Sequence, residues 1–270
     1  MAGEVRFRKD LYAGTAASYD RFRPPYPVAL LDELRARVPL DGDGAGRVLD
    51  LACGTGQIAF ALAPHVAEVW AVDQEAETVA FARQKAADAG VGNIRWVAAA
   101  AEEVVLDGRF VLVAIGNAFH RLDREAVARR LVPHLAARGC VALLWGGTPW
   151  GGDRPWQQVF GATLERWRDA VGARDRVPAG WEAAIERDPH AQVLERAGLT
   201  YEGRFDSTVV QRWSVTSLLG FVHSTSFLNR SALGDRADAF ARDLQARLLA
   251  CRPDGVFEQD LTFSCELARR

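Results

Sequence analysis

The segment from Arg47 to Phe60, RVLDLACGTGQIAF, constrains the fold more than any other stretch of the chain. A short apolar run that ends at Asp50 predicts a buried strand. Small residues then recur at every second position: Ala52, Gly54 and Gly56. The residues from Ile58 onward are compatible with a helix, so the order is strand, tight turn, helix. A ligand can approach the backbone of such a turn, and the free N–H groups of the first helical turn point toward it.

Two classes of ligand compete for this turn. The segment from Gly54 to Ala59 fits the dinucleotide fingerprint G-x-G-x-x-G/A, which is a weak signal by itself. Asp50 argues against a pyrophosphate, because a carboxylate repels phosphate but suits a ligand that carries an ammonium group. S-adenosylmethionine (SAM) has that ammonium group and no phosphate. The next strand ends at Asp73, whose carboxylate can accept hydrogen bonds from the ribose hydroxyls of either ligand. Asp73 therefore does not distinguish the two ligands, and Asp50 favours SAM.

From Asp50 to Gly56 the chain resembles the class I SAM-dependent methyltransferases, whose first motif is an acidic residue followed by alternating glycines. The resemblance continues through Asp73, Ala101-Glu102 and the segment from Asn117 to His120. It implies a Rossmann-like, doubly wound α/β fold with a mostly parallel seven-stranded sheet, an antiparallel last strand and a helical lid insertion. The cofactor-binding candidates are Tyr19, Arg23, Asp50, Ala52, Gly54, Thr55, Gly56, Asp73, Gln74, Ala101, Glu102 and Asn117.

Two of these assignments have a structural alternative. In similar methyltransferases a Tyr-Asp-x-x-Arg-Pro segment closes over the methionine end of SAM, which implies contacts from Tyr19 and Arg23; the alternative is a helix packed on the edge of the domain. An acidic residue that often binds the adenine amino group is replaced here by Ala100. Adenine is then recognised by backbone near Ala101 or by Glu102, unless Glu102 only starts a helix.

The segment that follows the fourth predicted strand carries the candidates for catalysis and acceptor binding. Ligands in open α/β sheets lie at the carboxyl ends of strands, which makes His120 the first candidate for a general base. His223, on a later helix, is a weaker candidate. Similar enzymes often read Ala-Phe-His-Trp here, and Arg121 replaces the Trp, which suggests an anionic acceptor. The acceptor-binding candidates are Phe119, Arg121, Trp145 and Trp150.

Alternating strand and helix patterns up to Trp145 predict a parallel sheet covered on both faces. After a glycine-rich loop, Trp156, Phe160, Leu164 and Trp167 lie at helical spacing, more typical of a core than of a cofactor contact. The predicted division is a SAM-binding core with N-terminal cap helices (1–147), a helical substrate lid (148–198), and the remaining core sheet with further lid helices (199–270).

Composition limits the kinds of binding partner that can be expected for this chain. The chain has 270 residues and a net charge of −2, with no dense basic patch, so nucleic acid is not expected. The four cysteines, Cys53, Cys140, Cys251 and Cys265, lack metal or redox spacing, and no metal site is expected. Neither a signal core nor a membrane span is evident, so we expect a cytoplasmic protein. A small-molecule acceptor is the expected partner, and monomer and homodimer both stay open.

Three functions follow from these patterns. The first is a methyltransferase that moves the methyl group of SAM to an oxygen, nitrogen or carbon atom of a small molecule such as a natural product or organic acid, leaving S-adenosylhomocysteine. The second is a protein of the same fold that binds SAM but catalyses another reaction, such as a cyclisation. The third, an NAD-dependent oxidoreductase, is disfavoured by Asp50 and by the lack of a recognisable catalytic set.

Overall fold

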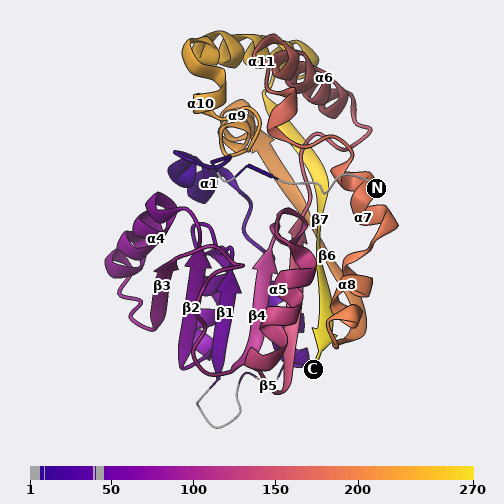
Figure 1. Cartoon of the computed structure of the whole chain (residues 1–270). Coiled ribbons are helices and arrows are strands. Elements are labelled where there is room, and N and C mark those ends of the chain that lie inside the picture. The colour runs from indigo at the N-terminus through magenta and orange to yellow at the C-terminus, as the bar shows by residue number, and fades with distance from the viewer. Residues whose placement is uncertain (1–6, 9, 39, 41–45) are drawn as a thin grey trace.

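The strand that leads into the glycine turn lies inside the sheet, with a parallel strand on each side (Figure 1). The computed structural model describes residues 7, 8, 10–38, 40 and 46–270. Within them one seven-stranded sheet has the order β3-β2-β1-β4-β5-β7-β6. The strands are β1 (Arg47–Leu51), β2 (Glu68–Asp73), β3 (Ile94–Ala98), β4 (Phe110–Gly116), β5 (Leu135–Gly146), β6 (Thr200–Ser214) and β7 (Val256–Arg269).

The pairing confirms the predicted doubly wound sheet. Strands β1 to β5 pair in parallel, and β7 runs antiparallel between β5 and β6. The first and fourth strands lie at the centre, and Val48, Leu49, Leu112 and Val113 are fully buried. Because helices cover both faces of these strands, their sequences are continuous apolar runs rather than alternating patterns.

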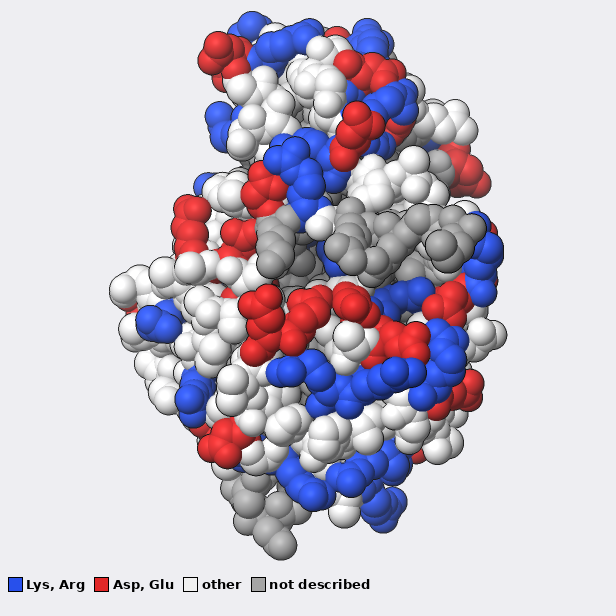
Figure 2. Space-filling view, in the orientation of Figure 1, with Lys and Arg blue, Asp and Glu red and all other residues white. Residues whose placement is uncertain are grey.

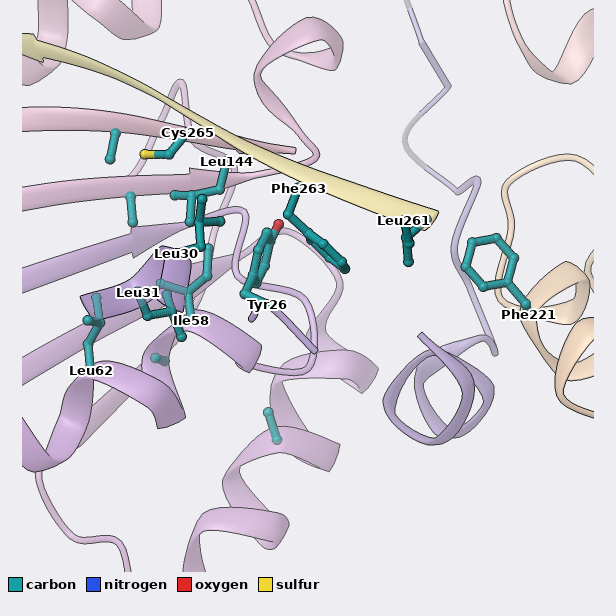
Figure 3. Close-up of a cluster of buried hydrophobic side chains, with 14 of the residues drawn as sticks. Tyr26, Leu30, Leu31, Ile58, Leu62, Leu144, Phe221, Leu261, Phe263 and Cys265 are labelled. Carbon is teal, nitrogen blue, oxygen red and sulfur yellow. The ribbon is translucent and has the colours of Figure 1, made fainter. Parts of the chain in front are cut away.

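The helices on each face of the sheet pack against it through a separate apolar cluster. The helices are α1 (Ala16–Phe22), α2 (Val28–Arg37), α3 (Gln57–Leu62), α4 (Ala76–Asp88), α5 (Arg124–Leu131), α6 (Pro155–Ala170), α7 (Trp181–Arg187), α8 (His190–Arg196), α9 (Val215–His223), α10 (Arg230–Leu233) and α11 (Ala237–Cys251). Helices α2, α3 and α4 contribute to one cluster, and α5 and α8 to the other. Figure 3 shows Leu30 and Ile58 of the first cluster beside Leu144 of the sheet.

A second layer of helices stands beyond the carboxyl ends of the central strands. The long strands β6 and β7 continue past β5 toward helices α6, α9, α10 and α11 (Figure 1). Helix α6 packs on α11, and α9 packs on α1. The predicted apolar stripe of α6 is buried in this layer, and Trp167 meets Phe240 of α11 edge to face. The stripe is therefore core, as its spacing predicted.

Helix α8 has a different place from its neighbours in sequence. It packs against α5 and against β6 and β7, and its residues Val193 and Leu194 belong to the apolar cluster of the sheet. This part of the predicted lid segment covers the sheet, while α6 joins the upper layer. The division into 1–147, 148–198 and 199–270 stays a prediction. Among the described residues no helix is both long and apolar enough to cross a bilayer.

Proline and glycine set two helix boundaries. Helix α5 ends at Leu131, because Pro133 has no N–H group to continue it, and β5 begins at Leu135. Helix α11 starts at Ala237, after Gly234, which has a φ of +52°. The alternative that Glu102 starts a helix is wrong, since residues 101–103 form a turn. The predicted loop over 41–45 lies outside the described residues.

Candidate active site

A cavity of about 370 Å³ opens at the carboxyl ends of β1, β2 and β4, below α1 and the chain that precedes it (Figure 1). This is the position at which open α/β sheets bind their ligands. The predicted cofactor residues that line it are Tyr19, Arg23, Asp50, Ala52, Gly54, Thr55, Asp73, Gln74, Ala101, Glu102 and Asn117. Of the predicted acceptor and catalytic residues, Arg121 alone lines the cavity. The sequence motifs thus converge on one site, although they come from five separate segments of the chain.

The glycine turn is held in a backbone conformation that favours glycine. Ala52, Gly54 and Gly56 have φ angles of +56°, +54° and +82°. A Cβ atom at Gly54 would have no neighbour within 4 Å, so the cavity side of the turn is open. At Gly56 the same atom would lie 2.5 Å from Cη2 of Trp96. Gly56 therefore allows helix α3 to pack tightly and, in contrast to the other two, does not line the cavity.

Asp73, the last residue of β2, connects the turn to the start of the next helix. Its Oδ2 accepts a hydrogen bond from the N–H of Gly54 at 2.8 Å, and its Oδ1 accepts one from the N–H of Glu75 at 2.9 Å. Burial raises the pKa of the carboxyl group, while these two N–H groups act to lower it. Each carboxylate oxygen keeps a second acceptor site that a ribose hydroxyl can use.

Asp50 carries the most unusual electrostatics of the cavity. Its side chain is 1% exposed, and Oδ2 accepts a hydrogen bond from the N–H of Ala59 at 2.9 Å. The other oxygen, Oδ1, is buried and has no partner among the described residues. Burial raises the pKa of this carboxyl group from 3.8 to about 7, and the nearby charge of Asp73 adds to the effect. A cationic ligand group would satisfy the unpaired oxygen and favour the ionised form.

Arg23 and Tyr19 close the same end of the cavity from α1. The Arg23 guanidinium lies 4.3 Å from the ring centre of Phe221 and 5.0 Å from that of Tyr19. Its Nε donates a hydrogen bond of 2.7 Å to the hydroxyl of Ser224, just after α9. The side chain thus faces the cavity and also connects α1 to the upper layer, so both interpretations of this segment describe part of its role.

The opposite end of the cavity is formed by the turn after β3. Ala99, Ala100 and Ala101 line it with little more than backbone. Glu102 lines it as well and accepts a hydrogen bond of 3.1 Å from the N–H of Asp123. Glu102 therefore holds the segment after β4 in place and also faces the cavity. The small side chains of the three alanines leave room for a flat ring.

Asn117 lines the cavity as part of a buried support. The residue has a φ of +51°, and its side-chain oxygen accepts from the N–H of Gly146 at 3.0 Å. Its Nδ2 donates to the hydroxyl of Tyr26 at 3.1 Å. Figure 3 shows Tyr26 next to Phe263, and their ring centres are 5.8 Å apart. These contacts fix the ends of β4 and β5 relative to one another.

His120 does not line the cavity, which corrects the placement expected from its sequence position. Its ring packs 4.7 Å from Trp181, 5.7 Å from Trp145 and 5.8 Å from Phe7, centre to centre. Burial, with a smaller contribution from the cations Arg121 and Arg124, lowers the pKa of His120 from 6.5 to about 3. An imidazole with this pKa is a weak proton acceptor near neutral pH. The geometry gives His120 a packing role.

This placement predicts the behaviour of His120→Phe. Because the folded protein holds His120 neutral and the unfolded chain protonates it below pH 6.5, the free energy of unfolding falls between pH 6.5 and pH 3. At pH 5 this one group costs up to about 2 kcal/mol. We expect the variant to lose less thermal stability than the wild type between pH 7.5 and pH 5, and to bind S-adenosylhomocysteine within about twofold of it. A large loss of turnover at unchanged affinity would restore the general-base assignment.

Four other candidates lie outside the cavity lining. Phe119 is fully buried against His190, and Trp145 stacks on the same imidazole with ring centres 5.0 Å apart. Trp150 packs on Phe160 and other aromatic rings of the upper layer. His223 is 6% exposed and packs edge to face on Phe240, and burial lowers its pKa. These side chains stabilise the walls around the site, and His223 has no path to the cavity as a base.

Sequence reasoning missed several residues that line the cavity. Phe7, Leu11 and Tyr12 belong to the segment that covers it, and Tyr26 and Gln57 form part of its wall. One signal was available, because Tyr12 and Tyr19 lie seven residues apart, two helical turns, and their rings meet at 6.5 Å. The others depend on contacts between distant segments. For example, the Leu11 carbonyl accepts a hydrogen bond from buried Asn229.

The surface around the opening mixes both signs of charge. Figure 2 shows a band of acidic side chains across the middle of this face and a row of basic side chains below it. Neither sign gathers into one large patch on the face drawn, in contrast to the basic surfaces typical of nucleic-acid binding. Within the part of the chain that the structure describes, no three His, Cys, Asp or Glu side chains are arranged to hold a metal ion.

The cavity fits SAM in three respects. Its volume lies within the range of small-molecule sites. The buried, unpaired Oδ1 of Asp50 is an acceptor for an ammonium group, and Asp73 at the next strand end is an acceptor for ribose hydroxyls. The small residues after β3 leave space for adenine. These features come from the geometry of the described residues and agree with the sequence motif.

Comparisons with known proteins identify a methyltransferase domain in this chain. Residues 48–139 match the family described as methyltransferase domain. Over 139 residues the chain is 30% identical to the uncharacterized methyltransferase YcgJ of Bacillus subtilis, a match that covers 51% of this chain and 54% of YcgJ. The chain thus spans about half the length of this relative.

Two solved structures share the fold. A proposed type II methyltransferase from Anaeromyxobacter dehalogenans has a TM-score of 0.61 at 20% identity, covering 92% of this chain and 97% of the other. The cyclase SpnF has a TM-score of 0.56 at 17% identity, covering 99% of this chain and 97% of the other. At these identities the likeness concerns the fold alone.

Proposed function

We propose that this chain, whose residues 48–139 match the methyltransferase domain family, binds SAM in this cavity and transfers its methyl group to a small-molecule acceptor. The observation that carries the proposal is the unpaired Oδ1 of Asp50, buried at the end of β1 beside the open glycine turn. A buried carboxylate oxygen without a donor destabilises the free protein and is satisfied by the ammonium group of the ligand.

Each end of the cofactor would have its own partners. Asp50 would accept from the ammonium group, with Tyr19 and Arg23 near the methionine carboxylate. Asp73 would accept from the ribose hydroxyls through the oxygen sites that Gly54 and Glu75 leave open. The backbone after β3 would face adenine. This arrangement uses the three strand ends β1, β2 and β3 in order, as expected for an elongated ligand lying across the sheet.

When bound, SAM supplies an electrophilic methyl group whose transfer to a nucleophile leaves a neutral thioether. The protein then has to align the acceptor with that group and keep water out. Helix α1 and the chain before it cover the cavity, and the Arg23 contact with Ser224 holds this cover against the upper layer. No histidine lines the cavity among the described residues, so the acceptor atom would either carry a free lone pair already or lose its proton to one of the carboxylates or tyrosines of the lining.

A second candidate function rests on the shared fold with SpnF, which is named a cyclase. A protein of this fold can use the cavity for a reaction that leaves the methyl group of SAM in place. The two functions differ in one measurable product. Methyl transfer releases S-adenosylhomocysteine in step with the consumption of an acceptor, whereas a cyclisation leaves SAM unchanged.

The first test is calorimetric titration of the protein with SAM and S-adenosylhomocysteine, with NADH as the control. We expect micromolar binding of both adenosyl ligands and no binding of NADH, since Asp50 disfavours a pyrophosphate. Screening of acceptors for formation of S-adenosylhomocysteine then separates methyl transfer from the alternative. Binding of NADH alone would mean that the glycine turn serves a dinucleotide and that the proposal is wrong.

A further inference from the structure

Arg121 lies at the cavity with a guanidinium group that nothing else in the described chain satisfies. Its side chain lines the cavity, and its Nε and Nη1 atoms are buried without hydrogen-bond partners. No carboxylate of the described residues forms an ion pair with it. Its charged group instead lies 5.0 Å from the ring centre of Phe7 and 4.9 Å from that of Tyr12. Buried donor atoms of a cation that lack acceptors are costly, and an anion in the cavity would accept from them.

The other two arginines of the cavity are already engaged. Arg8 is exposed and pairs with Asp10 at 2.7 Å. Arg23 donates to Ser224 and packs between two aromatic rings. The acidic residues on the same side are also in use, because Glu102 accepts from the N–H of Asp123. Arg121 thus has two buried donor atoms without acceptors, whereas the Nε of Arg23 is already paired.

We propose that Arg121 binds a carboxylate group of the acceptor, and that the acceptor is an organic acid with an apolar, ring-sized body. A guanidinium group presents its N–H groups in a planar fork that matches a carboxylate. Phe7, Leu11, Tyr12 and Leu122 surround this part of the cavity and offer the apolar surface for the body. The inference rests on the proposed methyl transfer, since it assigns the acceptor of that reaction.

The carboxylate of SAM itself is the competing anion. That group is joined to the same carbon as the ammonium group, so it lies close to Asp50. The backbone carbonyl of Arg23 accepts from Gln57, in the first turn of α3, and the N–H of Ala59 in the same helix binds Asp50. Arg23 therefore belongs to the ammonium end. Arg121 follows β4 on the side of Leu122 and Glu102, which leaves it for the acceptor.

The test compares matched acids and amides on protein saturated with S-adenosylhomocysteine. The probes are benzoate against benzamide and 3-phenylpropanoate against 3-phenylpropanamide, titrated by calorimetry. We expect wild-type protein to bind each acid at least about tenfold more tightly than its amide. In Arg121→Gln this preference should fall to within about twofold, and Arg121→Lys should keep part of it. Arg129→Gln, the matched control on the exposed face of α5 outside the cavity, should keep all of it.

The outcomes separate the inference from the function on which it rests. Equal binding of acid and amide by the wild type, or no binding of either acid, would overturn the carboxylate assignment while SAM binding stands. A tenfold or larger loss of affinity for S-adenosylhomocysteine in Arg121→Gln, with a normal melting curve, would assign Arg121 to the cofactor carboxylate instead. If the wild type fails to bind S-adenosylhomocysteine at all, the proposed function itself is wrong.

Discussion

Asp73→Ala is expected to weaken the binding of S-adenosylhomocysteine by about 100-fold or more. In the proposed site the substitution would remove two charge-assisted hydrogen bonds to the ribose, each contributing about 1.5 to 3 kcal/mol. It also releases the N–H groups of Gly54 and Glu75, which the carboxylate now holds at 2.8 and 2.9 Å. The substitution would therefore remove the hydrogen bonds that hold the glycine turn, and also the acceptor for the ribose hydroxyls. Calorimetric titration measures the loss, and a melting curve shows whether the fold survives.

Asp73→Asn should be nearly as harmful, although it is almost the same size. The amide nitrogen would face either the Gly54 or the Glu75 N–H, so two donors would meet where a donor and an acceptor now pair. Asp88→Ala is the matched control, because Asp88 ends α4 on the surface and accepts only from Gln84. Retention of affinity within about threefold in both Asp73 variants would remove Asp73 from the proposed site.

The motif around Asp50 could be recognised in the sequence because it is formed by residues that are adjacent in the chain. A strand, a turn with left-handed residues and a helix start are specified by neighbours in sequence, and the same is true of Asp73 at the end of the next strand. Parallel strands bring their carboxyl ends to one edge of the sheet, so local motifs on different strands converge. The doubly wound, mostly parallel seven-stranded sheet and its antiparallel last strand followed from the resemblance and are confirmed.

His120, Trp145 and Trp150 show where this reasoning fails. Position after a strand predicts that a segment borders the cavity, but the direction of each side chain depends on what packs behind it. The ring of His120 lies among Trp145, Trp181 and Phe7, three residues from widely separated parts of the chain. Its neighbour Arg121 lines the cavity instead. No local pattern distinguishes the two, since the difference is set by tertiary contacts.

The cover of the cavity was unpredictable for the same reason. Asn229 caps α10, where its side-chain oxygen accepts from the N–H of Ala232. Its amide nitrogen also donates to the carbonyl of Leu11, more than two hundred residues away. The second contact holds the N-terminal segment over the cavity, and no local sequence pattern predicts this contact.

Asp50→Asn is expected to lower the affinity for S-adenosylhomocysteine at pH 8 by about 100-fold, because the ammonium group loses its buried ionic partner. In the wild type the affinity should itself depend on pH. With the pKa of Asp50 near 7 in the free protein, about nine-tenths of the carboxyl groups are ionised at pH 8 and about one-tenth at pH 6. Binding of the cation requires the ionised form, so the affinity should fall about tenfold between these two pH values.

The stability of the ligand-free protein should change in the opposite sense. The folded pKa of Asp50 lies above the unfolded value of 3.8, so the folded protein binds more protons between pH 4 and pH 7, and this group lowers the free energy of unfolding as the pH rises. At pH 8 the cost is about 4 kcal/mol. Asp50→Asn removes the buried charge, so without ligand the variant should melt at a higher temperature than the wild type at pH 8, and the difference should shrink toward pH 5.

The two measurements together identify the role of Asp50. A carboxylate that serves only the fold would make the asparagine variant less stable and leave ligand affinity independent of pH. A carboxylate kept for an ammonium group gives weaker binding in a protein that is more stable, because the unpaired Oδ1 destabilises the free protein until the ligand arrives. Wild-type affinity that stays constant from pH 6 to pH 8 would show that Asp50 is not the partner of the ammonium group.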